Sequence, residues 1–100
     1  MKALGRIDEA LTNFRHALLL KPQFPLNYCH LGDCLSEKGE LKSAEANYRQ
    51  ALLIEPENAL LHYKLAWVLQ QQDDMASAGA SYRRALELAP DFVNEWVRSV

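Results

Sequence analysis

The chain has 100 residues, 49% of them hydrophobic, and a net charge of −2. This length and hydrophobic content suffice for one packed domain and exclude wholesale disorder, while the acidic balance makes nucleic acid and anionic membranes poor partners. No apolar run approaches the ~20 residues that cross a bilayer and no secretory signal opens the sequence, so we expect a cytoplasmic chain without membrane contact.

The spacing of apolar residues predicts a series of helices joined by short turns. One segment shows the pattern clearly, with a helix face at i, i+3, i+4 and i+7: Tyr28, Leu31, Gly32 and Leu35. In chain order, the predicted helices run over about residues 8–20, 25–38, 42–54, 59–72 and 76–88, with short stubs at 1–4 and 92–100.

Residues that stop or cap helices mark the predicted turns. Gly39 predicts a helix end, and Glu40 is a plausible cap for the helix that follows. Pro56 ends the next helix, and Asn58 is a good N-cap for the one after it. Asp73 stands where the previous unit has Gly39, so we expect that turn to be tighter or slightly strained.

The sequence repeats with a period of 34 residues, shown most simply by Pro22, Pro56 and Pro90. The same step relates further residues of matching class: Ala10, Ala44 and Ala78; Phe14, Tyr48 and Tyr82; Ala17, Ala51 and Ala85; Leu18, Leu52 and Leu86. Because neither helix of a unit can cover its apolar face alone, the units must stack on one another. Small residues are expected where helices approach closely: Ala10, Ala44, Ala78, Gly32 and Ala66.

These residues resemble the tetratricopeptide repeat, whose pattern is W-x2-L-G-x2-Y…A-x3-F…P. The middle unit meets it with Tyr28-x2-Leu31-Gly32-x2-Leu35, Ala44-x3-Tyr48 and Pro56. The next unit meets it with His62-x2-Leu65-Ala66-x2-Leu69, Ala78-x3-Tyr82 and Pro90, where His62 departs from the usual aromatic. The resemblance implies an all-α fold, a right-handed superhelical stack of antiparallel helix-turn-helix repeats (an α-solenoid).

In this register, residues 1–24 form a partial repeat, 25–58 and 59–92 are complete repeats, and 93–100 begin a further one. Both ends therefore fall within a unit, and we interpret the chain as a fragment of a longer array or as one whose ends a partner copy covers. Apolar edges near Leu4 and Trp96 predict end-to-end self-association.

The candidates for metal binding or catalysis are few: Cys29, His30, Cys34 and His62. Cys29 and Cys34 lie five residues apart and so point to different faces of a helix. The sequence has no CxxC pair, HExxH motif, phosphate-binding glycine loop or nucleophile elbow. We therefore expect no enzymatic activity, no cofactor and no metal site.

The resemblance also implies a binding surface, since the first helix of each unit lines a concave groove in tetratricopeptide arrays. The residues expected on that surface are Leu26, Cys29, His30, Asp33 and Glu37 in one unit, and Leu60, Tyr63, Lys64, Trp67 and Gln71 in the next, continuing to Asn94 and Arg98.

Tyr63 and Trp67 are the strongest candidates for binding, because exposed aromatics beside the cations Lys64 and Arg98 suit recognition of a peptide. The alternative is that both rings are covered by the next unit and extend the core. Some members of the family grip a C-terminal carboxylate with Lys, Asn and Arg. Lys64 and Arg98 occupy matching basic positions. However, Cys29 and Asp33 stand where the clamp has Lys and Asn in its first unit, and His30 replaces an Asn if this unit is instead the second, so a carboxylate clamp is not expected. An asparagine ladder, used by another branch, is also missing.

Three functions follow from different classes of protein. The leading hypothesis is a scaffold that binds a protein or peptide partner in the groove. The alternative is a targeting or substrate-presenting arm of a larger enzyme, such as a glycosyltransferase, whose catalytic domain lies outside this chain. RNA binding, by analogy with pentatricopeptide repeats, is disfavoured because that family repeats every 35 residues and this chain is acidic.

Overall fold

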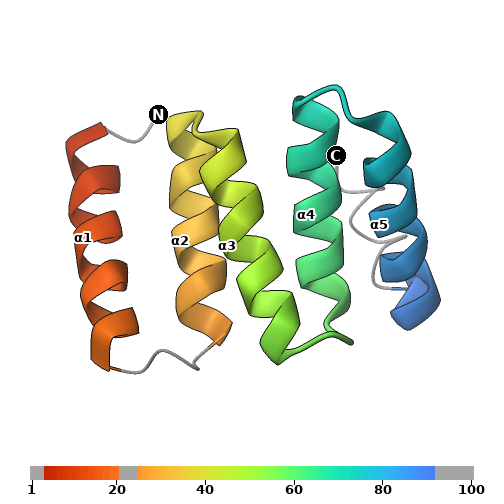
Figure 1. Cartoon of the computed structure of the whole chain (residues 1–100), viewed down its shortest axis with the longest axis horizontal. Helices are drawn as coiled ribbons and strands as arrows, with labels where there is room; N and C mark the ends of the chain where they lie inside the picture. Colours follow the sequence, from red (N-terminus) through yellow and green to blue (C-terminus); the bar gives the residue numbers. More distant parts are fainter. Residues whose placement is uncertain (1–3, 21–24, 92–100) are drawn as a thin grey trace.

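The computed structural model describes residues 4–20 and 25–91, and all the regular elements in these ranges are helices. In chain order they are α1 (Leu4–Leu20), α2 (Pro25–Lys38), α3 (Leu41–Ile54), α4 (Ala59–Gln71) and α5 (Met75–Leu88). The helices stand side by side in that order, each packed chiefly against its neighbours in the sequence (Figure 1). The predicted all-α stack of helical repeats is confirmed.

The observed bounds agree with the predicted segments to within one residue for α2 to α5, but α1 differs. It begins at Leu4 and runs without a break, whereas the sequence predicted a stub at 1–4 followed by a helix from about residue 8. Gly5 lies in the first turn of α1. A glycine keeps both backbone hydrogen-bonding groups, so it can be part of a helix at a modest cost in free energy. The separate stub is therefore wrong for Leu4, while residues 1–3 lie outside the described residues.

The turns within the α2–α3 and α4–α5 hairpins have the same backbone geometry. The Gly39 and Asp73 N–H groups donate to the carbonyls three residues earlier, at 3.1 and 3.0 Å. The next N–H groups, of Glu40 and Asp74, donate to carbonyls five residues earlier, at 2.9 and 3.0 Å. Both turns need a left-handed residue, Gly39 with φ of 88° and Asp73 with φ of 63°. The predicted strain at Asp73 thus has a backbone cause, since residues with a Cβ resist this conformation.

Of the three helix starts whose N-cap residues the structure describes, two have a side-chain cap and one does not. Asn58 accepts a hydrogen bond from the Leu61 N–H at 3.2 Å, which confirms the predicted N-cap of α4. Asp74 caps α5 in the same way, accepting from the Ser77 N–H. Glu40 occupies the N-cap position of α3, but its side chain makes no capping bond. The predicted side-chain cap at Glu40 is wrong. The glutamate side chain is one methylene longer than that of Asp, and the shorter side chains of Asp and Asn suit the N-cap position better.

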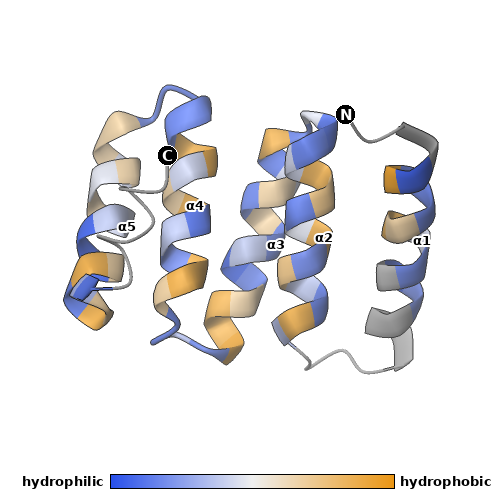
Figure 2. Cartoon of the chain, turned by 180° about the vertical axis from the view of Figure 1, so that it is seen from behind, coloured by the Kyte–Doolittle hydropathy of each residue, from blue (hydrophilic) through white to orange (hydrophobic). Residues whose placement is uncertain are grey.

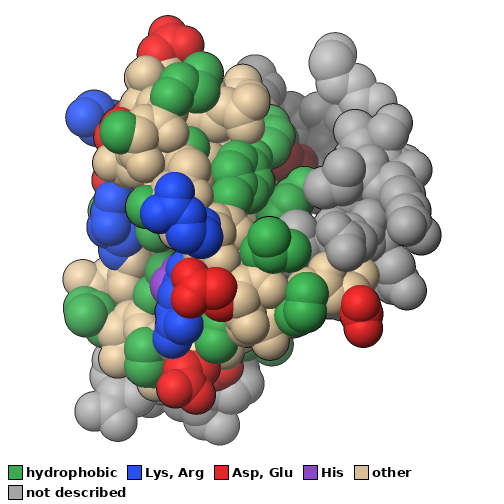
Figure 3. Space-filling model, turned by 90° about the vertical axis from the view of Figure 1, so that its right-hand side faces the viewer, with side chains coloured by type: hydrophobic (Ala, Val, Ile, Leu, Met, Phe, Trp, Pro, Cys, Tyr) green, Lys and Arg blue, Asp and Glu red, His purple; other side chains and the backbone are tan. Residues whose placement is uncertain are grey.

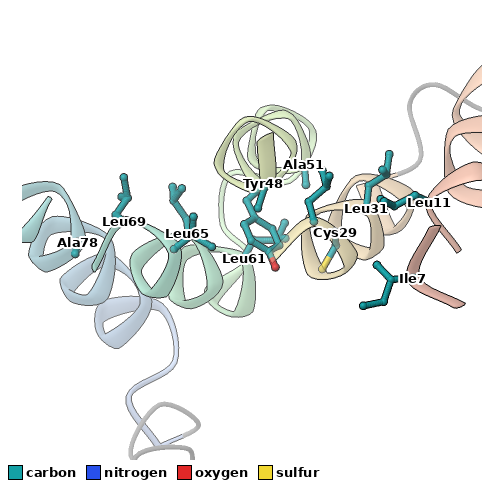
Figure 4. Packing of buried hydrophobic residues seen from close by; sticks show 13 residues of the cluster. Ile7, Leu11, Cys29, Leu31, Tyr48, Ala51, Leu61, Leu65, Leu69 and Ala78 are labelled. Carbon is teal, nitrogen blue, oxygen red and sulfur yellow. The ribbon is translucent and has the colours of Figure 1, made fainter. Parts of the chain in front are cut away.

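The hydrophobic core runs through the whole row of helices, as the apolar stripes in Figure 2 indicate. Small residues allow the helices to approach, since Ala44 and Ala66 are completely buried. The helices also approach closely at Gly32, where an added Cβ would lie 2.6 Å from Cε1 of Tyr48. In Figure 4 the Tyr48 ring extends from α3 into the space between α2 and α4. The predicted packing role of Gly32 is confirmed, since the absence of a side chain at this position leaves room for the Tyr48 ring.

Apolar side chains also reach the surface at the α5 end of the molecule, where they mix with charged ones (Figure 3). Met75 is 58% exposed, whereas Ile7, two units earlier at the equivalent position, is buried. Leu86 of α5 is likewise exposed. The same repeat position is therefore buried in α1, at one end of the row, and exposed in α5, at the other end.

Candidate functional site

The largest concentration of predicted site residues lies between α2 and α4. An open pocket of about 280 Å³ there, which we call the α2–α4 pocket, is lined by Asp33, Ser36, Glu37, Tyr48, Tyr63, Lys64 and Trp67. Asp33, Ser36 and Glu37 come from α2, Tyr48 from α3, and the remaining three from α4. The structure thus brings together side chains from two successive helix hairpins.

Asp33 joins three helices at the base of this pocket. Its carboxylate accepts a hydrogen bond of 2.5 Å from the Tyr48 hydroxyl. Its other oxygen lies 2.7 Å from Nζ of Lys64, in an ion pair whose side chains are about one third exposed or less. Both oxygens are therefore engaged by the chain itself, and α2 is tied to α3 and to α4 through one side chain.

Burial shifts the acid–base chemistry of two groups beside Asp33. Burial, reinforced by the hydrogen bond to the Asp33 carboxylate, raises the pKa of Tyr48 well above its usual range. The phenol consequently keeps its proton and remains a donor. Burial also raises the pKa of the Cys29 thiol, although the nearby Lys64 ammonium opposes the shift. Cys29 is therefore a poor nucleophile at neutral pH, since the thiolate is the reactive form.

Tyr63 and Trp67 differ in how far they are packed. The Tyr63 ring lies edge-to-face against Tyr82 of α5, with ring centroids 5.4 Å apart, and it is half-buried. Trp67 is 43% exposed, which is unusual for so large an apolar side chain. Tyr63 thus contributes both to packing and to the pocket wall, whereas the indole of Trp67 presents much of its surface to solvent.

A second, smaller pocket of about 100 Å³ lies nearer the start of α2 and α4. Its lining includes Leu26, Cys29 and Leu60 from the predicted set, with Pro25, Glu55, Asn58 and Leu61. Leu26 and Leu60 are one repeat period apart and are 49% and 36% exposed, respectively. Cys29 is buried at 8% and belongs to the core cluster, so its side chain offers little surface to a partner.

The remaining predicted residues are more scattered. His30 of α2 is half-buried, and Gln71 is exposed at the end of α4. Asn94, Trp96 and Arg98 lie outside the described residues, so neither the second cation of the predicted surface nor the predicted end-to-end contact can be placed.

Tyr48 and the Asp33–Lys64 ion pair were missed by the sequence reasoning. Lys64 lies 31 residues after Asp33, which is three residues, or about one helical turn, short of the 34-residue repeat. The two residues therefore lie on the same face of the first helices of successive units, about one turn apart. Tyr48 was assigned to the core, correctly, since it is only 2% exposed. Its hydroxyl nevertheless reaches the pocket because α3 packs behind α2.

Across 4–20 and 25–91, no three side chains of His, Cys, Asp or Glu come close enough together to hold a metal ion. None of the helices in the same ranges has both the length and the apolar run needed to cross a membrane.

Helix hairpins stacked in sequence order, with a pocket between alternate helices, define the class of α-helical repeat proteins. Family models identify the particular repeat. A model described as TPR repeat matches residues 33–73, and models described as Tetratricopeptide repeat match residues 2–24 and 59–92. The chain belongs to the tetratricopeptide repeat family. Among curated proteins, none matches the chain.

Solved structures with the same fold include a thermophilic TPR protein of Thermus thermophilus, with 29% identity over 94% of this chain and a TM-score of 0.84. The first TPR of Spaghetti, bound to the HSP90 peptide SRMEEVD, has 18% identity over 95% of the chain and a TM-score of 0.86; the match covers 77% of that protein. The Yersinia enterocolitica chaperone SycD, in complex with a peptide of the translocator YopD, has 22% identity over 94% of the chain and a TM-score of 0.85, covering 74% of that protein. The chain spans only about half of the Thermus protein and of MamA, 48% and 52% respectively.

Proposed function

We propose that the chain is a protein-interaction scaffold and that the face formed by α2 and α4 binds a peptide or a surface of a partner protein. The observation that carries this proposal is the 43% exposure of Trp67 beside Tyr63 in the α2–α4 pocket. Large aromatic side chains supply much of the free energy of association at protein interfaces. A half-exposed indole in a pocket wall therefore suits contact with a partner.

Leu26 and Leu60 extend this apolar surface toward the start of the two helices. They are exposed at equivalent positions of successive units and line the second pocket. Apolar side chains spaced along a bound peptide can contact such positions in turn. The face therefore offers an extended apolar strip rather than a single cavity.

Two relatives in fold support the same interpretation, since Spaghetti and SycD were each solved with a bound peptide. Tetratricopeptide repeats are typically modules that bind other proteins rather than catalysts, which favours a scaffold here. The Asp33–Lys64 ion pair argues against recognition of a C-terminal carboxylate, because Asp33 already neutralises the lysine at this position.

The test is selection of random peptides, displayed on phage, against the immobilised chain and against its Trp67→Ala variant. Leu53→Ala is the matched control, since Leu53 is an exposed apolar residue of α3 outside both pockets. We expect peptides that are retained by the wild type and by Leu53→Ala but are lost from Trp67→Ala. Equal retention by all three proteins would place the binding surface elsewhere. Circular dichroism confirms that each variant is folded.

A further inference from the structure

The α2–α4 pocket combines aromatic surface with a negative formal charge. Its lining carries two carboxylates, Asp33 and Glu37, and one ammonium, Lys64. The lining also has three aromatic side chains, Tyr48, Tyr63 and Trp67, and one hydroxyl, that of Ser36. Aromatic faces attract cations through their quadrupole, and carboxylates attract them through charge. Both features of the lining therefore favour the same kind of ligand group.

The one ammonium in the lining is held by a neighbouring acid. Nζ of Lys64 lies 2.7 Å from Asp33, so an incoming carboxylate would have to compete with Asp33 for the lysine. It would also approach Glu37, whose charge has the same sign. An incoming cation is repelled by Lys64, but Asp33 offsets that charge from 2.7 Å and Glu37 adds an attraction, so the lining as a whole favours a cation.

We propose that the α2–α4 pocket receives a lysine or arginine side chain of the partner peptide, an inference that rests on the proposed function. The aliphatic part of that side chain packs against Trp67 and Tyr63, and its charged end interacts with Glu37. Long cationic side chains suit such a position because their stems bury well against apolar surface while the charge stays at a polar edge.

The pocket is small for a site that takes a whole ligand molecule. Its volume of about 280 Å³ is below the ~300–1,000 Å³ typical of sites for whole small molecules. Glu37 already interacts within the chain, but a carboxylate accepts several hydrogen bonds and can receive a further donor. The exposed position of Glu37 on α2 leaves room for that approach.

The experiment uses the peptides selected on the wild-type chain, which are sequenced and aligned. We expect lysine or arginine to be enriched at one position of the retained peptides. A synthetic peptide with that residue, and its counterpart with methionine there, are then titrated against the chain by fluorescence anisotropy. The basic peptide should bind about fivefold to tenfold more tightly, the effect of one ion pair and one cation–π contact at a partly exposed site.

Glu37→Gln tests the named residue, and Glu9→Gln is the matched control, since it removes the same charge from an exposed position of α1. The preference for the basic peptide should fall to about twofold in Glu37→Gln and stay unchanged in Glu9→Gln.

The outcomes separate this inference from the function on which it rests. Retained peptides that depend on Trp67 but show no basic position, or that bind equally with methionine, overturn the cationic pocket and leave the scaffold intact. Enrichment of acidic residues overturns it as well. Failure to retain any peptide overturns both proposals.

Discussion

Gly32→Ala adds a single methyl group at a close contact between α2 and α3, and its effect can be worked out from the structure. The new Cβ would lie 2.6, 2.8 and 2.9 Å from three ring carbons of Tyr48. These atoms belong to a buried ring and not to the end of a flexible side chain, so the ring or the helix must move. Movement of the ring also disturbs the hydroxyl that donates to Asp33.

The magnitude follows from three contributions. Overpacking of a well-packed core costs ~1–3 kcal/mol, and weakening of the hydrogen bond to Asp33 adds ~1 kcal/mol. Alanine is favoured over glycine inside a helix by up to ~1 kcal/mol, which offsets part of the cost. We expect a net destabilisation of about 1–3 kcal/mol, or a fall in Tm of roughly 5–15 °C for a chain of this size.

The assay is urea unfolding followed by far-UV circular dichroism, with Gly79→Ala as the matched control. Gly79 also lies inside a helix, α5, but a Cβ there would meet nothing within 4 Å. We expect Gly79→Ala to stabilise the chain by about 0.5–1 kcal/mol. If Gly32→Ala were also stabilising, the ring of Tyr48 would have room to spare, and the argument for close approach would be refuted.

Three further predictions concern a turn, an acid and a thiol. Asp73→Gly should raise the free energy of unfolding by ~0.5–1 kcal/mol in urea, since it relieves a left-handed residue; a decrease would mean that the aspartate side chain supports the turn. The hydrogen bond from Gln72, reinforced by the hydrogen bond and charge of Arg49, lowers the pKa of Glu45 below its usual range. The stability that this carboxylate contributes is present above its unfolded pKa and is lost as the pH falls through its folded pKa. Gln72→Ala should therefore make the free energy of unfolding fall less steeply at acid pH; an identical pH dependence in both proteins would contradict the role of the Gln72–Glu45 hydrogen bond. Because burial raises the pKa of Cys29, iodoacetamide should alkylate it much more slowly in the folded chain than in urea, and equal rates by mass spectrometry would show that the thiol is accessible.

The fold could be predicted from the sequence because each signal is local and recurs. The 34-residue step repeats the helix ends and the small packing residues, so an error in one unit is corrected by the next. Asn58 shows the local part of the signal, since its position before α4 predicted the observed cap although the cap does not recur in the other units. Glu40 shows the limit of such local signals, because capping depends on the reach of the side chain and not only on its position.

The site could be predicted only in part, because its contacts join residues of different units. Helical periodicity placed Asp33, Lys64 and Trp67 on one face, and all three line the α2–α4 pocket. Periodicity does not say which of two neighbouring stripes is covered, and Cys29 proved to be buried. The pairing of Asp33 with Lys64 depends on the offset between stacked helices, which no single unit contains.

The packing of each helix chiefly against its sequence neighbours has a consequence for how the molecule opens. Few contacts between distant segments have to form together, so unfolding can start at either end of the row while the centre stays closed. Low contact order of this kind also favours rapid folding. Two interactions of Asp33, the hydrogen bond from Tyr48 and the ion pair with Lys64, oppose such gradual opening. They link α2, α3 and α4 into one cooperative block. Backbone amides at the centre of the row should then exchange with solvent as a group, and the pocket would be lost only when that block opens.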